Sequence, residues 1–205
     1  MSGGMSELRD SGVMIQLAHQ AMLKMGLDVD TVMTRLGVTP DLLTDRHVRT
    51  PHAAQALFWQ VLEEVSQDKD IGLHLGEHMP VYTGQVLQYL FLSSPTFGDG
   101  LSRVLNYQRL LSDATQATTD QDGTQACIIV DNSSDESGYL RHLNECLMLA
   151  MITFFRYVTD GEFRPSAIWF KHPSPADTSG HERIFGCPVL FDQAENRLYF
   201  SKTLL

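Results

Sequence analysis

The first half of the chain carries apolar residues at the spacing of amphipathic helices. From Val13 to Met25, apolar side chains recur every three or four positions until Gly26, the period of a helix that buries one face. Further helices are predicted to begin at Asp28, Pro40, Pro51, Asp70 and Ser94. Pro40 and Pro51 each follow a threonine, which is typical of a hydroxyl N-cap before a proline at the first helical position. This half is therefore predicted to be helix-rich.

The pattern changes after Asp113. Two segments rich in Thr, Ile and Val, residues 114–121 and 124–131, flank Asp122-Gly123, which is typical of a β-hairpin. The sequence then predicts a long helix over 136–158, a strand over 166–172, a short helix over 181–186, and strands over 188–192 and 197–201. Connections this short exclude parallel βαβ units.

The predicted fold class is α+β: a helix-rich N-terminal half, then a small, mainly antiparallel sheet with one long packed helix. No linker-like stretch divides the chain. We expect residues 1–10 to form a disordered tail and residues 11–205 to form one domain.

Composition and charge exclude several classes of protein. The net charge is −10 and the basic residues are scattered, so the chain is predicted to bind nucleic acid poorly. The longest apolar stretch, 146–155, is too short to span a membrane, and the N-terminus lacks the pattern of a signal peptide. The cysteines form no CxxC pair, which excludes a four-cysteine zinc site and favours a cytoplasmic location.

Two arrangements offer candidate catalytic chemistry. His74, Glu77 and His78 match H-x-x-E-H, the inverted zinc-protease motif, so a small metal-dependent hydrolase is the alternative interpretation. Gly76 and Pro80 disfavour the long regular helix that this chemistry requires. His142 and Cys146 share one helical face, but the apolar run after Cys146 is typical of a packed core cysteine. We therefore predict no catalytic residues, no metal and no cofactor.

Binding of a small molecule suits the remaining features better. The candidate ligand-binding residues are Tyr89, Tyr107, Arg109, His142 and Trp169, which are polar-tipped side chains next to strongly apolar stretches. Such groups orient a ligand in an apolar pocket. For Arg109 two interpretations stay open: a cation that stabilises a helix C-terminus, or a guanidinium that binds a carboxylate inducer.

An ordered set of short motifs resembles the N-terminal effector domain of AraC/XylS-type transcription regulators, the arabinose-binding-like branch. The segments that carry the resemblance are 70–76 (DIGLHLG), 92–101 (LSSPTFGDGL), 106–113 (NYQRLLSD), 170–177 (FKHPSPAD), 185–191 (FGCPVLF) and 196–200 (NRLYF). Gly100 departs from the family, which usually has alanine at that position.

The resemblance implies a domain that senses a small-molecule inducer and forms a homodimer. The apolar faces of the N-terminal helix and of the helix over 136–158 are the two candidate dimer surfaces. Family members continue into two helix-turn-helix units beyond the position of Leu205, so DNA binding is expected only through that additional domain. The resemblance implies no particular inducer, because pocket residues rather than the fold determine specificity.

Overall fold

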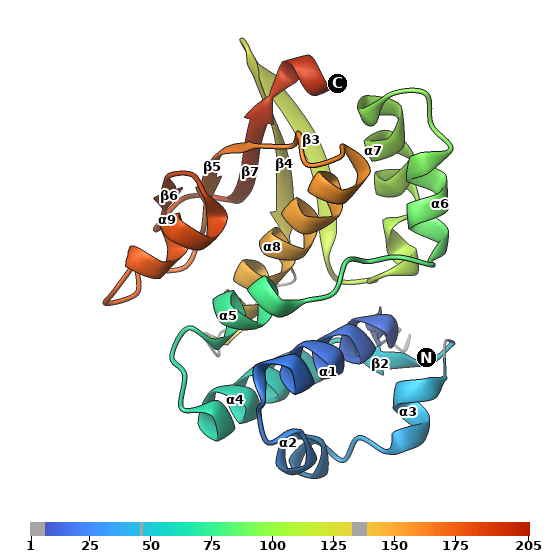
Figure 1. The fold of residues 1–205 in the computed structure, drawn as a ribbon, viewed down its shortest axis with the longest axis vertical. Coiled ribbons are helices and arrows are strands. Elements are labelled where there is room, and N and C mark those ends of the chain that lie inside the picture. Colours follow the sequence, from blue (N-terminus) through green and yellow to red (C-terminus); the bar gives the residue numbers. More distant parts are fainter. Residues whose placement is uncertain (1–6, 46, 133–138) are drawn as a thin grey trace, which may run out of the picture.

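The computed structural model describes residues 7–45, 47–132 and 139–205. Figure 1 shows helices α1 to α4 together at one end of the molecule, with the main sheet and helices α6 and α7 at the other. Helix α5 lies between these two ends, and α8 runs from beside α5 along the sheet toward α7. The structure confirms the predicted α+β fold.

The helices of the N-terminal end are α1 (Val13–Met25), α2 (Val29–Leu36), α3 (Pro40–Thr44) and α4 (Ala54–Ser66). Gly26 and Gly37 end α1 and α2 in the left-handed conformation, with φ of 72° and 65°, where a residue with a Cβ would be strained. Asp28 caps α2 by accepting a hydrogen bond from the Thr31 N–H at 3.1 Å. The predicted helix starts at Asp28 and Pro40 agree with the structure.

Two predictions for this end are wrong. Thr50 and Pro51 do not begin a helix but lie in strand β2 (Arg49–Pro51), and Arg9 and Asp10 are not part of a tail but lie in strand β1 (Arg9–Ser11). The two strands pair antiparallel, with Asp10 opposite Thr50. Pro51 is tolerated because it ends a short edge strand, where its missing N–H breaks no ladder. Residues 1–6 lie outside the described part of the chain.

Strand β1 also connects the N-terminal end to the second half of the chain. The Ser11 N–H donates to the Leu111 carbonyl at 2.7 Å, and the Asp113 N–H donates to the Arg9 carbonyl at 2.9 Å. This backbone pairing places Asp10 beside Ser112. Asp10, close to the N-terminus, is therefore fixed next to the segment that leads into the main sheet.

The middle of the chain continues through α5 (Ile71–His78), α6 (Val86–Leu92), α7 (Phe97–Asn106) and the short 3-10 helix η1 (Gln108–Leu110). Thr96 caps α7 by accepting a hydrogen bond from the Asp99 N–H at 3.1 Å. The helix predicted from Ser94 thus begins slightly later and ends before Arg109.

The main sheet has the strand order β3-β4-β7-β5-β6. Its strands are β3 (Gln116–Asp122), β4 (Gln125–Asp131), β5 (Pro165–Trp169), β6 (Val189–Leu190) and β7 (Asn196–Ser201). Neighbouring strands pair antiparallel, except for β5 and β6, which pair parallel. A short helix connects these two strands, so the exclusion of parallel βαβ units is wrong for this pair. The predicted hairpin forms, with Gly123 at φ 57° in its turn. The sheet is mainly antiparallel, as predicted.

Helix α8 (Leu140–Val158) is the long packed helix that the sequence predicts, and the short α9 (Ser179–Phe185) follows strand β5. Residues 136–138 of the predicted long helix lie outside the described residues. Helix α8 packs closely against α5, because Gly72 and Gly76 of α5 leave space for the α8 backbone at His142 and Cys146. Among the described residues, no helix combines the length and the apolar character of a membrane span.

The buried side chains form two clusters. The N-terminal cluster contains Met22, Val32 and Leu62 from the helices of that end. The C-terminal cluster contains Ile128 and Phe200 from the sheet, among others. Helices α5 and α8 contribute to both clusters, so they connect the two ends of the molecule.

Candidate functional site

A cavity of about 410 Å³ lies between the two hydrophobic clusters. Its walls come from the N-terminal helices α1 and α4, from the central helices α5 and α8, and from α7, β3 and β4 of the C-terminal part. Volumes of this size are typical of small-molecule sites. The cavity is therefore the candidate functional site.

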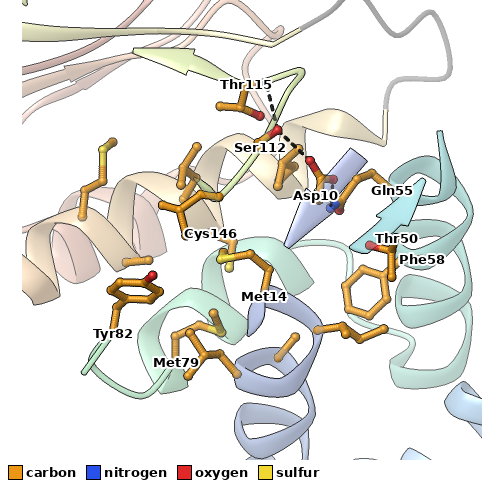
Figure 2. A pocket seen from close by; sticks show the side chains of 18 of the residues that line it. Asp10, Met14, Thr50, Gln55, Phe58, Met79, Tyr82, Ser112, Thr115 and Cys146 are labelled. Atoms are coloured by element: carbon orange, nitrogen blue, oxygen red, sulfur yellow. Dashed lines mark hydrogen bonds between the residues drawn. The ribbon is translucent and has the colours of Figure 1, made fainter. Parts of the chain in front are cut away.

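Apolar and sulfur-containing side chains form most of the wall. Figure 2 shows Met14, Phe58, Met79 and Cys146 around the cavity, with the Tyr82 ring on one side. Methionine adapts its shape to irregular apolar surfaces. Burial raises the pKa of Tyr82 to about 12, so its hydroxyl stays protonated at neutral pH.

The polar side chains gather mainly at the side of the cavity where β1 and β2 meet the segment before β3. Figure 2 shows Asp10, Gln55, Ser112 and Thr115 close together there. Asp10 accepts hydrogen bonds from Ser112 Oγ at 2.6 Å and from Gln55 Nε2 at 2.9 Å. Ser112 Oγ in turn accepts from the Thr115 N–H at 2.9 Å. We call Asp10, Gln55, Ser112 and Thr115 the polar end of the cavity.

Asp10 is the charged residue of this polar end. Only 4% of its surface is exposed, and burial alone favours the neutral acid. Hydrogen bonds from His52, Ser112 and Gln55 outweigh that burial and lower the pKa of Asp10 below its ordinary value. The carboxylate is therefore ionised at neutral pH. Of the described residues that line the cavity, none is a lysine, arginine or histidine.

The five predicted ligand-binding residues are not brought together, and none of them lines the cavity. Tyr89 on α6 and Tyr107 after α7 are 63% and 55% exposed. The Arg109 side chain is 80% exposed, with its Nε 4.0 Å from Asp113 Oδ1. Trp169 packs edge-on against Tyr199 with a ring separation of 5.0 Å. The geometry gives these four side chains no role in the cavity, because they face solvent or the sheet.

His142 is buried but serves to hold helices together. Its Nε2 lies 3.0 Å from Glu63 Oε2, and its Nδ1 accepts a hydrogen bond from the Gly72 N–H at 3.3 Å. Burial lowers the pKa of His142 below its usual value. Cys146 lines the cavity, and burial raises the pKa of its thiol to about 12. Cys146 is therefore a protonated wall residue rather than a thiolate paired with His142.

The H-x-x-E-H motif lies on α5, and its side chains turn to separate partners. His74 Nδ1 lies 2.6 Å from Asp68 Oδ2, and His78 Nδ1 bonds the His74 carbonyl at 2.9 Å. Glu77 lies 3.8 Å from Arg183. Across the described ranges, no group of three or more His, Cys, Asp or Glu residues is placed to hold a metal ion.

A second buried charged group, Glu145, lies on α8 outside the cavity. Glu145 is fully buried, with its Oε1 at 3.1 Å from His181 Nε2, 3.6 Å from His172 Nε2 and 3.5 Å from Arg141. Burial raises the pKa of Glu145, but the His181 hydrogen bond and the neighbouring positive charges lower it more. These contacts join α8 to α9 and to the segment after β5, which is a structural role.

Sequence reasoning missed the polar end of the cavity. The sequence predicts Asp10 to be part of the tail, because no periodic pattern near it indicates a strand. Ser112 falls within one of the family-like segments, 106–113, which is the one signal that pointed to this region. The partners of Asp10 lie 42 to 102 positions away in the chain, so local patterns cannot reveal them.

Comparison with known proteins places the chain among regulators of transcription. The family model described as the arabinose-binding domain of AraC transcription regulators, N-terminal, matches residues 26–205. The crystal structure of the transcriptional regulator CdpR from Pseudomonas aeruginosa has a similar fold, with a TM-score of 0.59 and 20% sequence identity. The match covers 86% of this chain and 54% of that chain, so this chain spans about half of that regulator's length. No curated protein sequence matches significantly.

Proposed function

This chain belongs to the family of N-terminal arabinose-binding domains of AraC transcription regulators, and we propose that it binds a small-molecule inducer in the cavity between its two ends. The observation that carries the proposal is the position of the cavity. Side chains from the N-terminal helices and from the sheet line the same space. A ligand there would contact both ends at once.

A ligand in this position has a means of changing the structure around it. It can alter an equilibrium only by binding one arrangement more tightly than another. Because the cavity walls belong to both hydrophobic clusters, a ligand that fills it favours the arrangement in which the two ends are close. We propose that this change in the arrangement of the two ends is how ligand binding regulates the protein.

We further propose that the domain forms a homodimer, with the apolar face of α6 as the contact surface. Val86, Tyr89 and Leu92 are all more than half exposed, and their spacing puts them on one face of the helix. Exposed apolar patches on a domain often mark contacts with other proteins. The long helix, one of the two faces expected from the sequence, is mostly buried against α5 and the sheet.

DNA contact is proposed for the helix-turn-helix domain that AraC-type regulators carry, rather than for these residues. The net charge of −10 supports this assignment, because affinity for DNA depends on clustered positive charge. The free thiols Cys127, Cys146 and Cys187 suit the reducing cytoplasm where such a regulator works. The proposed role is regulatory, and neither the His74 motif nor Cys146 supports a hydrolase.

Two substitutions test whether the cavity is the ligand site. A metabolite screen by thermal shift should find a compound that raises the melting temperature, since a ligand at 100 times its Kd stabilises a protein by about 2.7 kcal/mol. Ala150 lines the cavity, and Ala150→Leu should weaken that ligand by reducing the space. Ala176→Leu makes the same change at an exposed loop residue and should leave binding unchanged. A ligand that binds both variants and the parent equally would contradict the proposal.

A further inference from the structure

We propose that the cavity takes an elongated apolar molecule whose polar group is a hydrogen-bond donor, uncharged or positively charged, and that it rejects anionic ligands. This inference rests on the proposed function, because it names the class of molecule that the same cavity would sense. It is carried by the composition of the wall and by the charge of Asp10 at the polar end.

The wall excludes a sugar in spite of the family's name. A pentose carries a polar group on nearly every carbon, and each such group needs a hydrogen-bond partner once it leaves water. Here the polar partners gather mainly at one side, and residues such as Met14, Phe58 and Met79 form much of the remainder (Figure 2). A molecule with one polar end and an apolar body matches this distribution.

The polar end offers the Asp10 carboxylate as an acceptor, and one of its donors is shared. Oδ1 is contacted by Ser112 Oγ and His52 Nδ1, and Oδ2 by Gln55 Nε2 and the same His52 Nδ1. Because one His52 N–H serves both oxygens as a three-centre bond, a ligand hydroxyl or ammonium group can take over one of its two contacts.

An anionic ligand meets the opposite situation. Its charge would lie beside the ionised Asp10 in a low-dielectric space, where like charges repel much more strongly than in water. The nearby basic side chains pair with carboxylates of the protein, Asp10 included, and none of them is among the described lining residues. Arg49 lies 3.1 Å from Asp113, and His52 contacts Asp10 but is not one of the described lining residues. The Trp59 indole N–H is buried without a partner among the described residues, but a neutral donor does not cancel a like charge.

The cavity volume sets the size of the ligand. At about 30 Å³ for each water-sized group, 410 Å³ holds on the order of 14 such groups. A ten-carbon chain with a small polar end fits within this limit. Decylamine, decan-1-ol and decanoate therefore form a matched set of probes that differ in the charge of one end.

Trp59 provides a reporter inside the site. It lines the cavity, whereas Trp169, the second tryptophan of the chain, does not. In Trp169→Phe, the emission of Trp59 alone can be titrated with each probe at pH 7.5, below micelle formation. We expect decylamine and decan-1-ol to bind at least about tenfold more tightly than decanoate, and L-arabinose to leave the emission unchanged.

Variants at the polar end test the cause of this preference. Asp10→Asn removes the charge, so decanoate should approach decan-1-ol in affinity to within about threefold. Asp122→Asn, the same change at an exposed hairpin residue, should keep the parent preference. Gln55→Lys adds an ammonium group that can pair with Asp10, so it should also narrow the difference in affinity between decan-1-ol and decanoate. This variant keeps the test possible if Asp10→Asn fails to fold.

The outcomes separate this inference from the proposed function. If decanoate or arabinose binds the parent as tightly as decan-1-ol, the ligand class is wrong and the cavity is still a ligand site. If the preference survives both Asp10→Asn and Gln55→Lys, the role given to Asp10 is wrong. If none of the three alkyl probes gives saturable binding, the ligand class is wrong, and the metabolite screen with Ala150→Leu and Ala176→Leu decides separately whether the cavity is a ligand site.

Discussion

Replacing Gly72 by alanine should test how closely α5 and α8 depend on each other. A Cβ on Gly72 would lie 2.3 Å from His142 Cα, 2.5 Å from the His142 carbonyl oxygen and 2.7 Å from its carbonyl carbon. All three atoms belong to the α8 backbone, so no side-chain rotation relieves the contact. The helices must move apart for the variant to fold.

The expected loss of stability follows from two opposing effects. Gly72 is the second residue of α5, so alanine gains at most the roughly 1 kcal/mol that it has over glycine in a helix interior. Overpacking a close contact costs about 1–3 kcal/mol and occasionally more, and a clash with backbone belongs at the upper end. Movement of α5 also lengthens the hydrogen bond from the Gly72 N–H to His142 Nδ1, which is 3.3 Å in the structure. We expect a net loss of about 2 kcal/mol.

Gly180→Ala is the matched control, because a Cβ there meets only Leu73 Cδ2 at 3.6 Å, an ordinary contact. That variant should be as stable as the parent or up to about 1 kcal/mol more stable. Urea unfolding followed by circular dichroism measures both changes. With a slope of about 2 kcal/mol per molar urea, Gly72→Ala should lower the midpoint by roughly 1 M. Equal midpoints for the two variants would refute the packing argument.

Three further predictions concern pH, assembly and Arg109. Burial lowers the pKa of His142 below 6.5 in the folded state, so the folded state binds fewer protons than the unfolded state. The contribution of neutral His142 to stability should therefore be lost as the pH falls below about 6.5, and urea midpoints that do not fall between pH 7.5 and 5.5 would contradict this. Tyr89→Asp on the exposed face of α6 should shift a dimer toward monomer in light scattering while the circular dichroism of the folded domain stays unchanged, and an unchanged mass would remove α6 as the contact. Arg109→Lys should change neither melting nor ligand affinity, because its side chain is exposed outside the cavity; a weaker ligand in calorimetry would restore the carboxylate interpretation.

The sequence predicts those parts of the fold that local patterns determine. The helical stripe of α1 with Gly26 at its end, and the Thr/Ile/Val segments around Asp122-Gly123, carry their structure within a few residues. Strand β1 has no such pattern, because its pairing depends on residues far away in the chain. Thr50-Pro51 has a helix-start pattern that tertiary pairing overrides.

The candidate site was harder to predict for the same reason. A polar-tipped residue near an apolar stretch can face either side of its element, and Tyr89 and Tyr107 face solvent. The cavity forms where α1, α4, α8 and β4 meet, which is a property of the packed chain. The H-x-x-E-H motif shows the opposite kind of error, a sequence match that forms no site. Its side chains do not converge, because His74 contacts Asp68 and His78 contacts the His74 carbonyl.

The division of the buried residues into two clusters has a consequence for the order in which the protein opens. Helix α5 places Leu73 in one cluster and Leu75 in the other, and α8 places Met148 and Leu143 likewise. Proteins exchange amide hydrogens through cooperative units that differ in stability. The amides of α1 to α4 should therefore exchange as one unit and those of the sheet as another. The amides of α5 and α8 should report which unit opens first.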